Sequence, residues 1–292
     1  MATFVLITPA KNEEKNIGKT IESVIQQTNK PAEWVIVSDG SCDRTDEIIT
    51  SYCKNHSFIK YQRNESPVQK DFSSKVNAFN IGFKSLSISD FDFIGNLDAD
   101  ISFEPTYYEN LIHHLSSQPK LGLVGGHIYE VYNGKVIPMH TSLNSVAGAV
   151  QLFRRECFQE IGGYIPIKMG GIDSAAEICA RAKGWSVRTF PEYIVYHHGP
   201  VLTGTSSPLK TIYQKGHNKY RLGYHPIFHI VSSLLYLFKT PYILGAIYSI
   251  WGYCSSAVKK CDKVLPQEVI AYLRREQLRR LNPLMKKTAA YK

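Results

Sequence analysis

The sequence predicts an α/β fold with a mostly parallel central sheet and a helical appendage at its C-terminal end. Short runs rich in Val, Ile, Leu and Phe alternate with segments in which apolar residues recur every three or four positions. The predicted strands cover residues 4–7, 34–37, 58–61 and 91–97, and the predicted helices between them cover 17–25, 45–52 and 75–86. Since strand–helix–strand connections are right-handed, this alternation favours parallel neighbouring strands.

Each of these elements has its own local signal. Ile17, Ile21 and Val24 share one helical face, and Thr45 is a suitable cap for the second helix. Past residue 100 we predict a helix over 103–115, strands over 121–128 and 149–153, helices over 154–162 and 173–184, and strands over 187–190 and 194–196. We therefore expect one α/β domain over residues 1–207 and a separate helical region over 208–292.

The composition is that of a globular protein with an excess of basic residues. The 292 residues carry a formal net charge of +9, which suits nucleic acid, anionic lipid or a phosphorylated substrate as partner. The six cysteines are scattered without a Cys-x-x-Cys pair, so we expect neither a zinc site nor a disulfide framework. The N-terminus has no signal-peptide pattern, and both features favour the cytoplasm.

Two carboxylates directly follow the predicted strand 91–97. Asp98 and Asp100 are spaced i, i+2, and side chains at that spacing point to the same face of a strand. They repel each other unless a cation lies between them, and Mg²⁺ and Mn²⁺ prefer such oxygen ligands. The spacing therefore predicts a divalent-cation site, with a solvated turn at the strand end as the alternative.

Polar residues also follow other predicted strands. Thr8-Pro9, Asp39 and the pair Asp98 and Asp100 all fall at the carboxyl ends of strands. Ligands bind beyond these ends in open α/β sheets. The coincidence predicts a binding site at this edge of the sheet.

Several short segments, taken in order, resemble one protein family. They are Pro9–Glu13, Ser38–Thr45, Asp98–Asp100, Phe153–Arg155, Ile161–Tyr164, Gly171–Asp173 and Gly184–Trp185. Together they resemble the inverting, family-two glycosyltransferases, which have the Rossmann-like A-type nucleotide-sugar fold. The resemblance implies transfer of a sugar from a UDP- or GDP-sugar to a glycan or lipid-linked acceptor in the synthesis of a surface polysaccharide.

The resemblance implies that Pro9, Ala10, Asn12, Glu13 and Asp39 hold the nucleoside of the donor. The carboxylate of Asp39 would accept hydrogen bonds from the base or the ribose. From the residues alone, Asp39 also fits an ordinary Asp-Gly turn, and Glu13 fits an acid in the first turn of a helix.

The resemblance further implies that Asp98 and Asp100 place Mn²⁺ or Mg²⁺ against the donor diphosphate, with Asp98 also touching the donor. Lys75 lies in a segment that approaches the donor in the family, and an exposed helix lysine is the alternative. His197 or His198 would complete the metal shell, since Mn²⁺ accepts imidazole. The two histidines point to opposite faces of a strand, and polar surface residues are the alternative.

Asp173 is the expected catalytic base, because an inverting transfer needs a carboxylate that takes the proton of the attacking hydroxyl. The family usually has Glu-Asp here, whereas this chain has Ile172-Asp173. The resemblance therefore keeps Asp173 as the base but without its acidic neighbour. Glu177 is a substitute candidate for the base, and the alternative role of Asp173 is that of a helix N-cap. Arg154 and Arg155 belong to a segment that resembles the acceptor side of the family's site. The alternative is that both are solvated residues in the first turn of a helix.

The region 208–292 lies outside the resemblance and carries a second signal. Two apolar, aromatic-rich runs, 227–238 and 242–253, are interrupted by Lys-Thr-Pro and flanked by Lys and Arg. This pattern predicts a peripheral association of 226–258 with the anionic inner face of the cell membrane. A helix pair buried in a homo-oligomer interface and a pair that spans the bilayer are the alternatives.

These observations together predict a metal-dependent inverting glycosyltransferase. A nucleotidyltransferase of related fold is disfavoured because Pro9–Glu13 contains no glycine. A non-catalytic membrane-associated or glycan-binding scaffold is the other alternative, and it would not need the carboxylates. Nucleic-acid binding is disfavoured because the basic excess lies mainly after residue 208, beside the apolar runs.

Overall fold

The computed structural model of the chain describes residues 2–65, 72–132, 134–139, 142–199, 207–238 and 241–282. The chain divides into two compact units. The first, the sheet unit, comprises Met1–Lys168 and Ile172–Val201, and the second, the helical unit, comprises Met169–Gly171 and Leu202–Lys292.

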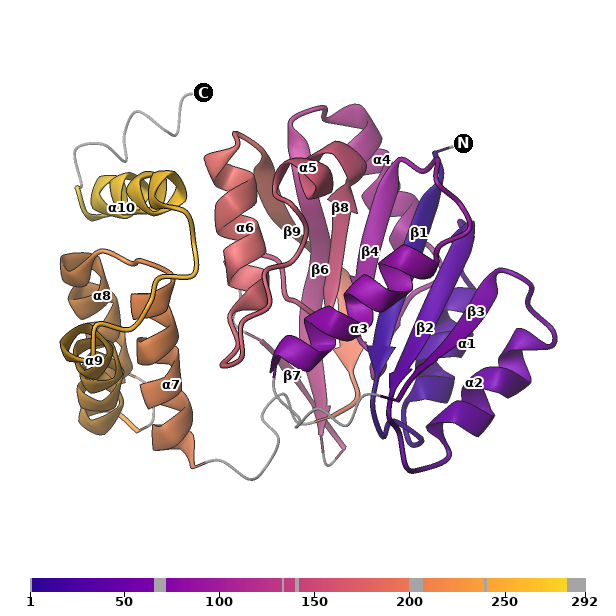
Figure 1. The fold of residues 1–292 in the computed structure, drawn as a ribbon, viewed down its shortest axis with the longest axis horizontal. Helices are drawn as coiled ribbons and strands as arrows, with labels where there is room; N and C mark the ends of the chain where they lie inside the picture. Colours follow the sequence, from indigo (N-terminus) through magenta and orange to yellow (C-terminus); the bar gives the residue numbers. More distant parts are fainter. Residues whose placement is uncertain are drawn as a thin grey trace. The chain divides into compact units, whose positions relative to one another are not determined.

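The first half of the sheet unit alternates strands and helices as predicted (Figure 1). Its elements are β1 (Phe4–Ala10), α1 (Ile17–Ile25), β2 (Glu33–Asp39), α2 (Thr45–Cys53), β3 (Ile59–Asn64), α3 (Phe72–Ser85) and β4 (Phe93–Leu97). The four strands lie in the order β3-β2-β1-β4, and every neighbouring pair is parallel. The predicted parallel arrangement is therefore confirmed for this half.

The second half of the sheet unit mixes strand directions. Its elements are β5 (Ile101–Phe103), α4 (Tyr107–Ser117), β6 (Leu121–Tyr132), β7 (Lys135–Pro138), β8 (Val150–Arg154), α5 (Arg155–Glu160), α6 (Ile172–Ala182) and β9 (Ser186–His197). The sheet continues β4-β8-β6-β9-β5, and β8 runs antiparallel to both β4 and β6, whereas β6 and β9 are parallel. The sequence predicted neither β5 nor β7, and it divided the continuous β9 into two strands.

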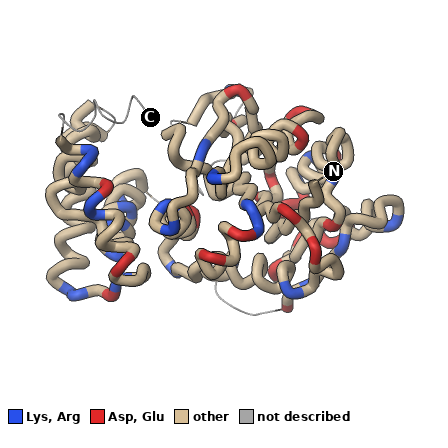
Figure 2. The backbone as a smooth tube through the Cα atoms, turned by 90° about the horizontal axis from the view of Figure 1, so that it is seen from above, with Lys and Arg blue, Asp and Glu red and all other residues tan. Residues whose placement is uncertain are grey.

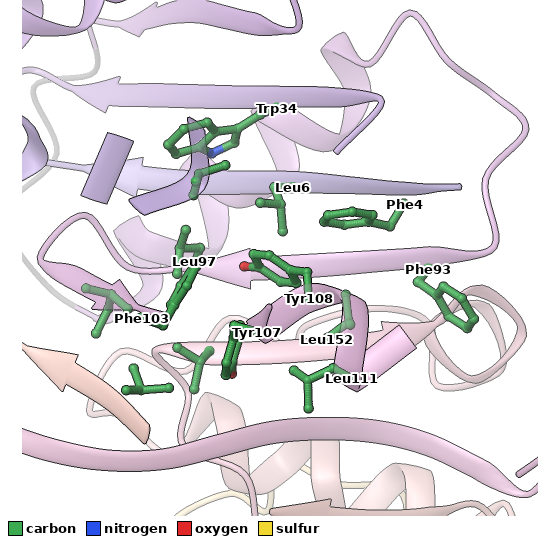
Figure 3. Close-up of a cluster of buried hydrophobic side chains, with 14 of the residues drawn as sticks. Phe4, Leu6, Trp34, Phe93, Leu97, Phe103, Tyr107, Tyr108, Leu111 and Leu152 are labelled. Atoms are coloured by element: carbon green, nitrogen blue, oxygen red, sulfur yellow. The ribbon is translucent and has the colours of Figure 1, made fainter. Parts of the chain in front are cut away.

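Both faces of the sheet are covered, which explains why the central strands are apolar at consecutive positions. On one face, Phe4 and Leu6 of β1 pack with Trp34 and with Tyr108 and Leu111 of α4 (Figure 3). On the other face, α3, α5 and α6 supply the partners of the alternate residues of β1, and these helices lie in front of the sheet in Figure 1. The three layers hold the strand ends rigidly in place.

The parallel strands bring their carboxyl ends to one edge of the sheet. In the register of β1 and β2, Ala10 is opposite Ser38, and in that of β1 and β4, Ile7 is opposite Asn96. The segments that follow β1, β2 and β4 therefore leave the sheet at the same edge. We call this the carboxyl edge.

The helical unit contains α7 (Pro208–Arg221), α8 (Pro226–Ser233), the 3₁₀ helix η1 (Leu234–Phe238), α9 (Ile243–Val258) and α10 (Gln267–Leu281). Helix α10 is polar and directly follows Pro266. Within the described part of the chain, every helix falls short of the length and apolar character that crossing a bilayer requires.

Candidate functional site

The segments after β1 and β2 are hydrogen-bonded to each other at the carboxyl edge. The backbone N–H of Asn12 donates to Ser41 Oγ (3.1 Å), and Asn12 Oδ1 accepts from the N–H of Cys42 (2.8 Å). The N–H of Glu13 donates to Thr45 Oγ1 (2.7 Å). Asn12 has a positive φ of 57°, which Asn tolerates better than most residues. These bonds fix the stretch from Pro9 to Glu13 against the β2 loop.

Asp39, the last residue of β2, is an oriented carboxylate. Its side chain is 10% exposed, and Lys11 Nζ lies 3.8 Å from Oδ2. Asn64 Nδ2 donates to Oδ1 at 2.7 Å, from the end of the neighbouring strand β3. A carboxylate held from one side by an amide keeps free lone pairs for a ligand on the other side. The sequence did not single out Asn64, whose contribution depends on strand pairing.

Asp98 and Lys75 form an ion pair at the end of β4. The N–H of Asp98 donates to the carbonyl oxygen of Ala149 (2.9 Å), which fixes its backbone beside β8. Lys75 Nζ, on α3, lies 2.5 Å from Asp98 Oδ1. Among the described residues, this buried oxygen accepts no hydrogen bond of regular geometry. The lysine and the carboxylate that the resemblance assigns to the donor are therefore in contact.

Asp100 faces His197 in a way that favours a cation between them. His197 Nε2 lies 3.2 Å from Asp100 Oδ2, and His197 Nδ1 lies 3.0 Å from the carbonyl oxygen of Gly199. A carbonyl oxygen only accepts, so Nδ1 carries a proton and a neutral imidazole presents the lone pair of Nε2 to the carboxylate. Two acceptors in contact require a proton or a metal ion between them.

The charge state of Asp100 reflects its surroundings. Burial raises the pKa of Asp100, and the neighbouring Asp98 carboxylate raises it further, whereas His197 and Lys75 oppose the rise. A cation bound at this position would stabilise the ionised form.

The second histidine of the pair is directed elsewhere. His198 Nε2 hydrogen-bonds to Ser102 Oγ (2.6 Å), and its backbone N–H donates to the carbonyl oxygen of Asp100 (2.8 Å). The alternation of side chains along a strand accounts for the difference from His197. Of the two histidines, His197 is the one next to the Asp100 carboxylate.

The donor set fits a divalent cation that also binds the substrate. In the described ranges, no group of three His, Cys, Asp or Glu side chains surrounds one point. Asp98 Oδ1 nevertheless has only Lys75 Nζ as a polar partner among the residues that the structure describes, and His197 Nε2 faces Asp100. Mg²⁺ and Mn²⁺ are commonly held by one or two carboxylates together with substrate phosphates. The residues present suit such a shared site.

Asp173 lies in the first turn of α6 and packs against the loop before β8. A Cβ atom added to Gly148 would lie 3.0 Å from Asp173 Cβ, so the loop backbone passes close to Asp173 here. The carbonyl oxygen of Gly148 accepts from Asn96 Nδ2 (2.6 Å), and Asn96 is two positions before Asp98 on β4. This chain of contacts connects Asp173 to the carboxyl edge.

A buried tyrosine lies within reach of the same carboxylates. The pKa of Tyr164 is raised by burial first, and then by the charges of Asp173, Asp98 and Glu177. Its hydroxyl donates to Gln151 Oε1 (2.7 Å). Because the charges of all three carboxylates raise the pKa of this one hydroxyl, α6 and the end of β4 border the same region of the sheet unit.

Glu177 has a different role from the substitute base considered above. It is 5% exposed, and it accepts hydrogen bonds from the N–H of Val146 (2.6 Å) and from Ser145 Oγ (3.0 Å). Its carboxylate therefore anchors the loop that contacts Asp173. Burial raises the pKa of Glu177 to about 7, the Asp173 charge adds to the rise, and the Val146 N–H opposes it.

We expect Glu177→Gln to remove a pH dependence of stability. The folded-state pKa of about 7 exceeds the ordinary 4.5, so the folded chain binds more protons between these pH values. Unfolding free energy should therefore fall as pH rises through this window, by on the order of 2–3 kcal/mol. Denaturant titrations of the wild type, E177Q and the exposed control E156Q at pH 5 to 8 test this. A slope in E177Q equal to that of the wild type would contradict it.

Arg154 and Arg155 lie away from the carboxyl edge. In the antiparallel register of β4 and β8, Arg154 is opposite Phe93 and Val150 is opposite Leu97, so the arginines lie at the amino end of β4. Arg154 donates to the carbonyl oxygens of Leu121 (3.1 Å) and Leu115, and Arg155 pairs with Asp90 (3.2 Å). Both arginines therefore lie at the opposite end of β4 from Asp98, and their acceptor role stays a prediction from the resemblance.

The chain matches the family described as Glycosyl transferase family 2 over residues 5–175. It is 26% identical, over 172 residues, to the poly-beta-1,6-N-acetyl-D-glucosamine synthase of Staphylococcus epidermidis, covering 52% of this chain and 39% of that protein. The synthase of the same description from Staphylococcus aureus (strain COL) is 26% identical over 210 residues, covering 65% and 48%. The chain thus spans less than half the length of these relatives.

Solved structures share the fold. The mannosyltransferase PcManGT from Pyrobaculum calidifontis, in complex with GDP-Man and Mn²⁺, has a TM-score of 0.57 at 16% identity, covering 98% of this chain and 83% of its own. Residues 1–349 of S. aureus TarS, in complex with UDP-GlcNAc, give a TM-score of 0.57 at 16% identity, covering 75% and 66%. The sheet unit therefore has the predicted A-type fold, and the chain belongs to glycosyl transferase family 2.

Proposed function

We propose that this chain transfers a sugar from a UDP- or GDP-sugar to a hydroxyl group of a glycan or lipid-linked acceptor, with inversion at the anomeric carbon and with Mn²⁺ or Mg²⁺ as cofactor. The observation that supports this most strongly is the gathering of carboxylates from separate segments. Asp39 ends β2, Asp98 and Asp100 follow β4, and Asp173 is connected to β4 through Gly148.

The relatives support the choice of donor and product. Those named above are polysaccharide synthases by description, and the two solved structures hold UDP-GlcNAc or GDP-Man. We therefore assign the chain to surface-polysaccharide synthesis. The donor site and the catalytic chemistry belong, in this proposal, to residues 1–207, and the match to the family over 5–175 lies within that range.

The donor would be held by residues of the carboxyl edge. Asp39, oriented by Asn64, accepts hydrogen bonds from the base or the ribose. The stretch from Pro9 to Glu13, which includes Ala10 and Asn12, is fixed by its bonds to the β2 loop and forms the adjoining wall. Lys75 exchanges its contact with Asp98 for the negatively charged diphosphate.

Asp98, Asp100 and His197 would hold the divalent cation, and the cation would stabilise the charge that develops on the leaving nucleoside diphosphate. His198 stays with Ser102 in this arrangement.

Asp173 acts as the base. Its carboxylate takes the proton from the acceptor hydroxyl while the oxygen of that hydroxyl bonds to the anomeric carbon. The bond from the anomeric carbon to the diphosphate oxygen breaks on the opposite side, which inverts the configuration. Glu177 contributes by holding the 145–149 loop against α6, as a positioning residue.

A donor screen tests the proposed function. The intact chain is incubated with UDP- and GDP-sugars and Mn²⁺, and release of the nucleoside diphosphate is followed. With water as the acceptor, we expect release from one or a few donors, abolished by EDTA. NMR recorded before the freed sugar mutarotates should show an anomeric proton of the configuration opposite to that of the donor. Release that is unaffected by EDTA, or a product that retains the donor configuration, would contradict the proposal.

A further inference from the structure

Helix α9 in the helical unit exposes its large apolar residues and buries its small ones. Its exposed large residues include Ile243 (64% exposed), Ile247 (52%), Trp251 (55%) and Val258 (84%), which follow one another at helical spacing. Its buried residues are mostly small, namely Gly245, Ala246, Ser249, Gly252, Tyr253 and Ser256. In an ordinary surface helix the large apolar residues face the core instead.

The small residues of α9 allow a close backbone approach to α7. A Cβ atom on Gly252 would lie 2.1 Å from the carbonyl oxygen of Tyr213, and one on Gly216 would lie 2.0 Å from that of Ser249. Polar side chains meet across the same contact, and His217 Nδ1 hydrogen-bonds to Ser256 Oγ (2.6 Å). Close packing through small residues, with internal polar contacts and large apolar residues outward, is typical of helices surrounded by lipid.

The exposed apolar surface continues from α9 onto its neighbours. Helices α8 and η1 pack against α9 and against each other. Their exposed large apolar residues are Ile227, Ile230, Val231, Leu234, Leu235, Leu237 and Phe238, and Phe238 is 82% exposed. We call the exposed residues of α8, η1 and α9 together the α8–α9 apolar face. Soluble monomers rarely expose apolar residues in such a continuous group.

The charged residues near the α8–α9 apolar face indicate the kind of surface that it would bind. The sequence contains neither Asp nor Glu between Glu192 and Asp262. Lys259 and Lys260, both exposed, directly follow α9, and α7 adds the exposed Lys215. Figure 2 shows acidic and basic positions in both units. In the sequence, the charged residues from 193 to 261 are all Lys or Arg. The helices of this face contain no carboxylate, and exposed lysines directly follow α9, so the face complements an anionic surface.

The length of α9 determines whether it could cross a membrane or only lie in the membrane surface. Its 16 residues span about 24 Å, which is less than the roughly 30 Å of a bilayer core. A helix of this kind lies in the boundary between headgroups and acyl chains, with its apolar residues directed into the membrane.

We propose that the α8–α9 apolar face inserts into the headgroup boundary of a membrane that contains anionic phospholipid, while Lys259, Lys260 and Lys215 contact the headgroups. This surface shares no residue with the proposed donor site, so its function can be tested without any sugar nucleotide.

Vesicle flotation of the intact chain tests the proposal. With vesicles of phosphatidylcholine and phosphatidylglycerol we expect most of the protein to float, and with phosphatidylcholine alone we expect binding weakened by about tenfold or more. F238S/W251S should weaken binding by at least about tenfold, and K259E/K260E by a similar factor. The control V136S/I137S removes two residues of β7, each 53% exposed, and should bind like the wild type.

Trp251 supplies a second readout that does not depend on flotation. Of the three tryptophans, Trp34 is fully buried, Trp185 is partly buried in the sheet unit and Trp251 is 55% exposed. Vesicle binding should therefore shift the emission of Trp251 to shorter wavelength, and W251F should lose that shift. Circular dichroism of each variant confirms that its helices are retained.

The alternative occupant is a second copy of the chain. Sedimentation without lipid would then give a dimer that F238S/W251S converts to a monomer, and neither vesicle type would bind. That result, or equal binding to the two vesicle types by the wild type and both variants, would overturn the proposal.

Discussion

Replacing Asp173 with Asn is expected to lower turnover by about 10² or more while leaving donor binding nearly unchanged. The amide keeps the size of the side chain, so the contact with Gly148 is preserved. It has no basic oxygen able to take the proton of the acceptor hydroxyl. The loss should therefore appear in kcat, with little change in the affinity for the nucleoside diphosphate.

The matched control for D173N is Asp90→Asn. Asp90 is fully exposed and pairs with Arg155, away from the carboxyl edge. D90N should keep wild-type turnover with the donor found in the screen, and E177Q should affect activity less than D173N does. Full turnover by D173N would remove this residue from the mechanism.

Replacing Asp98 or Asp100 with Asn is expected to reduce turnover by on the order of 10²–10³. Each change removes a negatively charged oxygen ligand, so a higher Mn²⁺ concentration should also be needed for half-maximal activity. The D98N variant additionally removes the ion-pair partner of Lys75, and D100N removes the carboxylate that faces His197.

For D98N and D100N, the measurement is donor hydrolysis as a function of Mn²⁺ concentration, again with D90N as control. Thermal melting in the absence of metal establishes that D98N and D100N remain folded. Unchanged Mn²⁺ dependence in both variants would show that these carboxylates do not hold the cation.

The first half of the fold could be predicted from sequence because its signals are local. Apolar runs such as Phe4–Ala10 alternate with helices whose buried face repeats every three or four residues, and the carboxylates directly follow the strand ends. Parallel neighbours then bring those ends to one edge, whatever the side-chain details. The location of Asp39, Asp98 and Asp100 follows from that rule alone.

The second half of the sheet unit could not be predicted in the same way, because it depends on strand direction, which no local sequence pattern encodes. In a mostly parallel sheet, Arg154 at the end of the strand 149–153 would lie at the carboxyl edge. Strand β8 runs antiparallel to β4, so the same position lies at the opposite edge. The three-residue β5 is too short to show periodicity, and all four residues of β7 are exposed, so neither has an apolar pattern.

The supporting residues of the site also escaped prediction, since each acts across a long sequence separation. Asn64 reaches Asp39 through the pairing of β2 with β3, and Glu177 reaches Val146 from a different segment. Gly148 offers the one local hint, because a glycine close to the end of a loop often marks a close backbone approach. Only the folded chain shows that Asp173 is the neighbour it accommodates.

Calorimetric titration of UDP and of GDP into the intact chain tests the central proposal most directly, because it needs neither the sugar nor the acceptor. With Mn²⁺ present, one of the two nucleotides should bind at a single site, and replacing Mn²⁺ with EDTA should weaken that binding by about tenfold or more. Binding of the same strength with EDTA, or no binding of either nucleotide in the presence of Mn²⁺, would contradict a shared site for a cation and a sugar-activating diphosphate.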